Sequence, residues 1–207
     1  SSRIGTIPSK ELYKFFDKEG NTLVLRPDFT PSIARATAKY FSEEDMPIRF
    51  CYMGNTFINN SDLQGRLKET TQIGAELIGD ATVEADAEMI SLVIESIKKT
   101  GLKDFQVSIG NVEFFKGLCG EYGIDEEAEL MIRESVSNKN YFETQDILDS
   151  LNMAADQKEV ILKVFELFGT IDTLAEAKSF VKNERSNKAI ERLEGLSVKE
   201  DVLAYLP

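Results

Sequence analysis

The sequence predicts an α+β fold, in which an antiparallel sheet is backed by helices and followed by a helical appendage. Short alternating runs typical of strands fall within the first 110 residues. Four of the five prolines lie in the first 47 residues and the next is Pro207, which permits long helices between them. Beyond residue 112 the apolar residues recur at helical spacing. We therefore expect two domains, residues 1–111 with the sheet and residues 112–207 as a helical subdomain.

The first predicted element is a hairpin. The runs ELYKFFD and TLVLRP suit two short strands, and Gly20 and Asn21 suit the turn between them. A helix is predicted to begin at Thr30, with Thr30 as its N-cap and Pro31 at its first position. The alternation in PIRFCYMGN then predicts a longer strand.

The segment TTQIGAELIG predicts a strand with two different faces. One face carries the residues that we expect to pack under helices, namely Thr71, Ile73, Ala75 and Leu77. The other presents an amide, a gap and a carboxylate in a row, at Gln72, Gly74 and Glu76. A glycine between two polar side chains leaves room for a ligand to approach the sheet. The same pattern also suits the solvated face of an ordinary antiparallel strand.

The rest of the chain is predicted to be mainly helical. A helix is expected from an N-cap at Thr82 to a stop at Gly101, followed by a strand in DFQVSIG. The later helical segments are VEFFKGLCGEYG, EEAELMIRESV, FETQDILDSL, QKEVILKVFELFG, TLAEAKSFVKNE and NKAIERLEGL.

Charge argues against a nucleic-acid-binding surface in the second half. The chain has 24 basic and 36 acidic residues, a net charge of −12. Residues 111–207 alone carry 11 basic and 20 acidic residues, a net charge of −9. A surface that binds nucleic acid needs clustered Lys and Arg. The acidity also suits a simple role in solubility.

The residue inventory excludes several kinds of chemistry. There is no histidine, so Ser-His-Asp triads, Cys-His dyads and His-ligated metal sites are excluded on this chain. Walker loops, GxGxxG turns, CxxC pairs and EF-hand loops are also missing, and we expect no cofactor or metal. The two cysteines suit a reducing cytoplasm, and no signal peptide or membrane-spanning run is expected.

Two short segments carry candidate binding groups. In LRPDFTPSIAR, Asp28 suits either a ligand ammonium or the ordinary favourable position of an acid at a helix N-terminus. In the loop SDLQGRLKETTQ, Arg66 and Lys68 suit either a phosphate contact or plain solvation.

Three segments together resemble the class II aminoacyl-tRNA synthetase core, specifically histidyl-tRNA synthetase. They are LYKFFDKEGNTLVLRPDFTPSIARA, MPIRFCYMGNTFINNSDLQGRLKETTQIGAELIG and VSIGNVEFFKGL, in the family's order and spacing from about residue 8 to residue 118. The resemblance implies the synthetase-like antiparallel sheet flanked by helices. It also implies an internal fragment, because the first and third class-defining motifs would lie outside residues 1–207.

The resemblance assigns roles to individual positions. Active class II synthetases carry Phe-Arg-x-Glu where this chain has Phe57-Ile58-Asn59-Asn60. An isoleucine cannot stabilise the charge that develops on the ATP phosphate, so adenylation is expected to be lost. Ile58, Asn60 and Arg66 would then be vestigial ATP-site positions, and the chain would have no catalytic residue. The resemblance places histidine against Asp28, which is Glu in the family, and against Thr30, Gln72 and Glu76.

A synthetase-like chain without adenylation resembles the regulatory-subunit family of ATP phosphoribosyltransferase. That resemblance implies a cytoplasmic, non-catalytic role in the first step of histidine biosynthesis. It implies association with the short catalytic subunit in a hetero-octamer, self-association of the full-length form as a dimer, and a response to L-histidine, without nucleic-acid or membrane partners. The alternatives are a histidyl-tRNA synthetase or divergent histidine-adenylating enzyme, and an unrelated α+β interaction module.

Overall fold

A computed structural model of the chain describes residues 7, 9–60, 65–138, 140–151 and 153–197. The chain folds as two compact units, Ser1–Ala81 and Thr82–Pro207. This division falls earlier than the predicted boundary after residue 111, because the helix Val83–Lys99 packs against the helix Glu184–Ser197 of the second unit.

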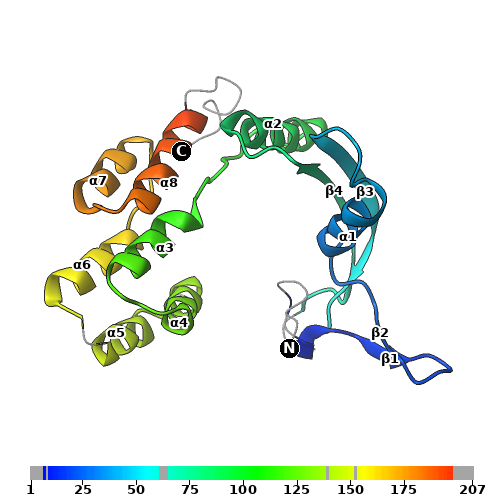
Figure 1. Ribbon diagram of the computed structural model, residues 1–207, viewed down its shortest axis with the longest axis horizontal. Helices are drawn as coiled ribbons and strands as arrows, with labels where there is room; N and C mark the ends of the chain where they lie inside the picture. Colours follow the sequence, from blue (N-terminus) through cyan, green and yellow to red (C-terminus); the bar gives the residue numbers. More distant parts are fainter. Residues whose placement is uncertain (1–6, 8, 61–64, 139, 152, 198–207) are drawn as a thin grey trace. The chain divides into compact units, whose positions relative to one another are not determined.

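The predicted hairpin is confirmed in the first unit. A short 3-10 helix (η1, Ser9–Glu11) precedes β1 (Lys14–Phe16) and β2 (Thr22–Val24), which pair antiparallel (Figure 1). Gly20 in the turn has φ +81°, a conformation that favours glycine. The Asp17 carboxylate accepts hydrogen bonds from the backbone N–H groups of Glu19 and Asn21, which closes the turn.

The helix α1 (Thr30–Tyr40) follows, with a different start from the one predicted. Its N-cap is Phe29, whose own side chain makes no capping hydrogen bond. Thr30 and Pro31 therefore occupy the first two helical positions, and the prediction of Thr30 as N-cap is wrong. The physical reason is a stronger partner elsewhere, because the Thr30 hydroxyl donates to a carboxylate oxygen of Glu76 at 2.6 Å.

The two long strands of the first unit form an antiparallel pair. β3 (Ile48–Phe57) and β4 (Glu69–Ile78) lie side by side (Figure 1). Their register places Phe50 opposite Glu76 and Gly54 opposite Gln72. Both predicted strands are confirmed.

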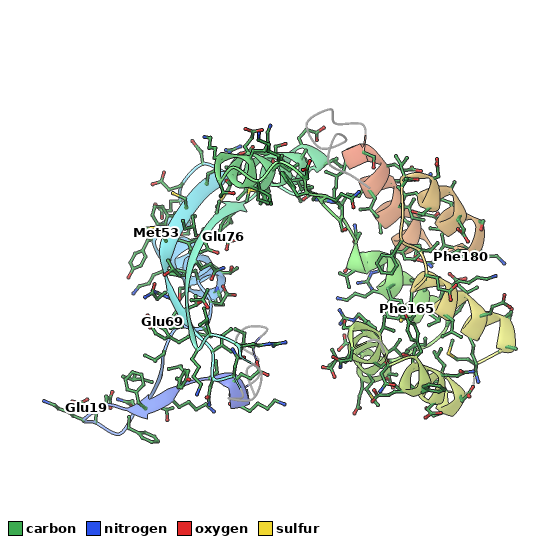
Figure 2. The ribbon with its side chains drawn as sticks, turned by 180° about the vertical axis from the view of Figure 1, so that it is seen from behind. Glu19, Met53, Glu69, Glu76, Phe165 and Phe180 are labelled. Carbon is green, nitrogen blue, oxygen red and sulfur yellow. The ribbon has the colours of Figure 1, made fainter. Side chains whose placement is uncertain are left out.

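The packing of this strand pair reverses one sequence prediction. The face expected to pack under helices carries Ile73 and its cross-strand neighbour Met53, which are 75% and 72% exposed. Aromatic residues beside α1 pack on the other face, where Phe29 stacks on Tyr52. Figure 2 shows Met53 and Glu76 on opposite sides of the pair. The polar face is therefore the one that carries a covering layer, because rings rather than aliphatic side chains supply the apolar contact.

The described part of the second unit is mainly helical. α2 (Val83–Lys99) begins as predicted, with the backbone N–H of Ala85 donating to the Thr82 hydroxyl, and Gly101 follows its end with φ +92°. The remaining helices, all predicted, are α3 (Val112–Glu121), α4 (Glu126–Ser137), α5 (Tyr141–Ser150), α6 (Ala155–Val164), α7 (Asp172–Phe180) and α8 (Glu184–Ser197) (Figure 1).

The strand predicted at residues 104–110 is wrong. Neither sheet in the described part of the chain includes this segment, which connects α2 to α3. Its alternation has another cause, because an extended connector also turns successive side chains to opposite sides. Ile109 from this connector lines a cavity of about 280 Å³ together with residues of α2 and α8.

The core of the second unit lies among α3 to α8. Leu118, Ile132 and Ile161 are completely buried, and Leu148 and Ile190 are nearly so. The ring centroids of Phe115 in α3 and Phe165, just after α6, are 5.5 Å apart (Phe165 is labelled in Figure 2).

A close helix contact in this core joins α3 and α8. Gly117 faces Asn183 and Ser186, and a Cβ at Gly117 would overlap both of their side chains. The Ser186 hydroxyl donates to the backbone carbonyl of Phe114 at 2.8 Å. Glycine at this position therefore lets the two backbones approach each other.

The two cysteines are expected to differ strongly in reactivity. Cys51 is exposed, whereas burial, together with the charge of Glu129, raises the pKa of Cys119 from its ordinary value of 9.0 to about 12. Because the thiolate is the reactive form, a thiol reagent at pH 8 should modify one cysteine in the folded chain and both in denaturant. Cys51→Ser should abolish the fast reaction, and a fast reaction that persists in this variant would contradict the burial of Cys119.

The described residues hold neither a candidate membrane span nor a candidate metal site. None of their helices combines the length and apolar character that a bilayer span requires. No group of three or more Cys, Asp or Glu side chains within the same residues is arranged to hold a metal ion.

Candidate functional site

The predicted histidine-binding residues come from the start of α1 and from β4. The Thr30 hydroxyl donates to Glu76 Oε1 at 2.6 Å, and the backbone N–H of Thr30 donates to Asp28 Oδ1 at 3.2 Å. Thr30 thus links the two carboxylates, although it is 46 residues from Glu76 in sequence. The structure brings these three predicted residues together.

Gln72 joins this group through Tyr52, which was not predicted as a site residue from the sequence. Gln72 Nε2 donates to the Tyr52 hydroxyl at 3.3 Å. Burial raises the pKa of Tyr52, and the negative charges of Glu76 and Asp28 raise it further, while a hydrogen bond with Thr30 acts in the opposite direction. Tyr52 therefore lies at the centre of the four predicted residues. We call these five residues, Asp28, Thr30, Tyr52, Gln72 and Glu76, the acidic cluster.

Two glycines allow the rings beside the cluster to lie flat against the strands. Tyr52 lies opposite Gly74, where a Cβ would overlap its ring and hydroxyl. A Cβ at Gly54 would lie 2.8 Å from the ring of Phe29. The Phe29 and Tyr52 rings stack with their centroids 4.5 Å apart. Gly74, predicted as a gap for a ligand, is thus filled from the neighbouring strand by Tyr52.

Arg26 completes the stack from the other side. Its guanidinium carbon lies 3.9 Å from the centroid of the Phe29 ring. Its Nε and Nη2 donate to the backbone carbonyl of Asn55 at 3.2 and 2.9 Å. Arg26, Phe29 and Tyr52 form a three-layer stack, and both cation–π attraction and ring stacking stabilise such an arrangement.

The cluster has the chemistry of a site for a cationic or N–H-rich small molecule. Asp28 and Glu76 offer carboxylate oxygens, and Gln72 offers a carboxamide oxygen. An ammonium or an imidazole N–H donates well to such acceptors, most strongly where the acceptor is charged. Thr30 and Asp28 are partly open to solvent, so a ligand can reach them.

The predicted vestigial positions lie away from this cluster. Ile58 and Asn60 follow the end of β3, where the Ile58 N–H donates to the Lys68 carbonyl and Asn60 Nδ2 to the Leu67 carbonyl. Arg66 is exposed in the same region. From the strand rise, this end is roughly 23 Å along the pair from Glu76. The structure therefore does not bring the two predicted groups together, and residues 61–64 of the intervening loop lie outside the described residues.

Comparison with known proteins identifies the family. The model of the family described as histidyl-tRNA synthetase matches residues 3–203. Curated relatives named ATP phosphoribosyltransferase regulatory subunit are 41% identical over 94% of the chain in Ruminiclostridium cellulolyticum and 40% identical over 92% in Bacillus licheniformis. The chain covers 46% and 49% of these proteins, about half of their length.

Solved structures agree with this assignment. A Bacillus halodurans protein described as an ATP phosphoribosyltransferase regulatory subunit/histidyl-tRNA synthetase is 32% identical with a TM-score of 0.86, over 98% of this chain and 52% of that chain. A histidyl-tRNA synthetase from Nostoc sp. PCC 7120 is 18% identical with a TM-score of 0.63, over 93% and 44%, which shows the fold alone. The predicted α+β fold of the class II synthetase type is confirmed. The chain belongs to the histidyl-tRNA synthetase family, and it is similar to members named ATP phosphoribosyltransferase regulatory subunits.

Proposed function

We propose that the protein containing this chain is the regulatory subunit of ATP phosphoribosyltransferase, inactive by itself, and that the acidic cluster binds histidine. The curated relatives at about 40% identity carry the name of that subunit. The cluster supports the second part, because it gathers two carboxylates and a carboxamide around one tyrosine. Histidine offers an ammonium and an imidazole N–H to such acceptors.

One observation carries the non-catalytic part of the proposal, namely isoleucine at position 58. An adenylating enzyme needs a cation where charge develops on the phosphate, and loss of such a group typically costs about 10²–10³-fold in rate. The nearby Asn60 amide is held by the Leu67 carbonyl at 3.2 Å and carries no charge. With isoleucine at position 58 and an uncharged amide at position 60, the chain keeps the proposed histidine site and lacks the groups that would activate the amino acid with ATP.

The partner is proposed to be the short form of the ATP phosphoribosyltransferase catalytic subunit, in a cytoplasmic hetero-octamer built on dimers of the regulatory subunit. The relatives' names support a catalytic partner in histidine biosynthesis. Histidine would then act by linkage, because a ligand that binds one state of the assembly more tightly shifts the assembly toward that state.

Reconstitution tests this proposal. The full-length protein is mixed with the short catalytic subunit of the same organism, and condensation of ATP with phosphoribosyl pyrophosphate is followed. We expect activity well above that of the catalytic subunit alone, and none with the full-length protein alone. No gain in the mixture of two folded proteins would refute the regulatory role.

A parallel assay addresses the synthetase alternative. The Bacillus halodurans protein is described by both names, regulatory subunit and histidyl-tRNA synthetase, which makes this test necessary. Histidine-dependent exchange between ATP and pyrophosphate is expected to be absent from the full-length protein. Exchange at the rate of an active synthetase would show that Ile58 does not abolish adenylation, and would favour that alternative.

A further inference from the structure

The hydroxyl of Tyr52 lies among polar groups. An aromatic side chain that only packs against its neighbours would not need this hydroxyl. The hydroxyl accepts a hydrogen bond from Gln72 Nε2 at 3.3 Å and also interacts with Thr30. Its ring stacks on Phe29 with the two ring centroids 4.5 Å apart, and Arg26 covers the far side of Phe29. The hydroxyl is therefore fixed in place from β3, while its partner Gln72 belongs to β4.

A carboxamide has a donor end and an acceptor end, and without a fixed partner it can present either one. With one Nε2 N–H group donating to the Tyr52 hydroxyl, the Gln72 amide has its donor end turned toward that hydroxyl. Its carboxamide oxygen then remains as an acceptor for a ligand N–H. Presenting the acceptor in advance avoids the cost of ordering the side chain on binding.

Glycine at position 74 is the second observation. Tyr52 and Gly74 face each other across the strand pair, and a Cβ at position 74 would overlap the Tyr52 ring and hydroxyl. Any larger residue at 74 must therefore displace the ring that bonds to Gln72. The geometry of both strands is thus suited to holding this tyrosine beside the amide.

We propose that Tyr52 is a positioning residue, whose hydroxyl orients the Gln72 carboxamide so that its oxygen accepts a hydrogen bond from the ligand. This assignment rests on the proposed function, since it takes histidine as the ligand. Tyr52 acts through Gln72 and is distinct from the four residues assigned to histidine by resemblance. Its contribution should therefore depend on the presence of the Gln72 side chain.

A double-mutant cycle on the full-length protein tests this dependence. Tyr52→Phe removes the hydroxyl and keeps the ring stack, and we expect it to weaken histidine binding about 3- to 10-fold, the range of one neutral hydrogen bond. In a Gln72→Ala background the same substitution should change the affinity less than about 2-fold. Calorimetric titration with L-histidine gives the four affinities. Tyr40→Phe, at a well-exposed tyrosine of α1, is the matched control and should bind as the unsubstituted protein does.

The possible results separate the two proposals. A loss in Tyr52→Phe that is equally large with and without Gln72 would overturn the positioning role and leave histidine binding intact. Full affinity in Tyr52→Phe would do the same. No histidine binding by the unsubstituted protein would overturn the proposed site itself. Gly74→Ala gives an independent check, because displacement of the ring should weaken binding at least as much as Tyr52→Phe, and full affinity would contradict the assignment.

Discussion

Glu76→Gln in the full-length protein is expected to weaken histidine binding about 10- to 150-fold. A hydrogen bond to a charged group contributes about 1.5–3 kcal/mol, and the substitution removes the charge from one of the two carboxylates of the acidic cluster. The amide oxygen of the new side chain can still accept from the Thr30 hydroxyl, which bonds to Glu76 at 2.6 Å. The fold of the first unit should therefore survive, so the loss will report on the ligand. Calorimetric titration with L-histidine measures it.

Glu69→Gln is the matched control for this experiment. Glu69 is on the same strand as Glu76, seven residues before it. Because successive side chains of a strand alternate between its faces, the two side chains lie on opposite faces (Figure 2). Glu69 accepts a hydrogen bond at 2.6 Å from Asn55 Nδ2, and Asn55 does not belong to the acidic cluster. Histidine affinity should be unchanged in this variant. Equal affinities for Glu76→Gln, Glu69→Gln and the unsubstituted protein would refute the site.

Leu118→Ala is expected to lower the free energy of unfolding of the second unit by about 3 kcal/mol. Leu118 is completely buried in α3, in the cluster that also contains Ile132 and Ile161. Substitution of a buried leucine by alanine costs about 2–5 kcal/mol, from the lost burial together with the cavity that remains. Urea unfolding followed by circular dichroism at 222 nm checks this value.

Leu92→Ala in α2 provides the comparison, because Leu92 is 46% exposed. We expect a loss of about 1 kcal/mol or less, since less apolar surface leaves water at this position on folding. Similar losses at the two positions would mean that Leu118 is not at the centre of the core.

Helices and their ends were predictable from the sequence wherever local chemistry decides them. Thr82 before an apolar helical pattern and Gly101 after it mark the bounds of α2, and the structure has both. Thr30 carries the same local signal, yet its hydroxyl bonds to Glu76 on a distant strand. A long-range partner that competes with the helix end cannot be seen in a local pattern.

The sequence predicts which residues of the strand pair share a face, but it does not predict which face is covered. Alternation separates Ile73 from Gln72 and Glu76, and this separation is present in the structure. Which face is covered depends on Phe29 and Tyr52, and their stack needs the register that brings Tyr52 opposite Gly74. Register is a property of two strands together, so Tyr52 was missed. An alternating run that ends in Ile109 likewise suits a connector as well as a strand.

The contact between α3 and α8 has a consequence for synthesis on the ribosome. The hydrogen bond from Ser186 to Phe114 joins residues 72 positions apart, and the Gly117 face of α3 is shaped for α8. Translation at about 5–20 residues per second needs roughly 4–14 seconds to cover this interval. During that time a nascent α3 exposes apolar surface without its main neighbour. Among the described helices of this core α8 emerges after the others and therefore completes it, and a polypeptide that stalls before Glu184 would present exposed apolar surface to chaperones.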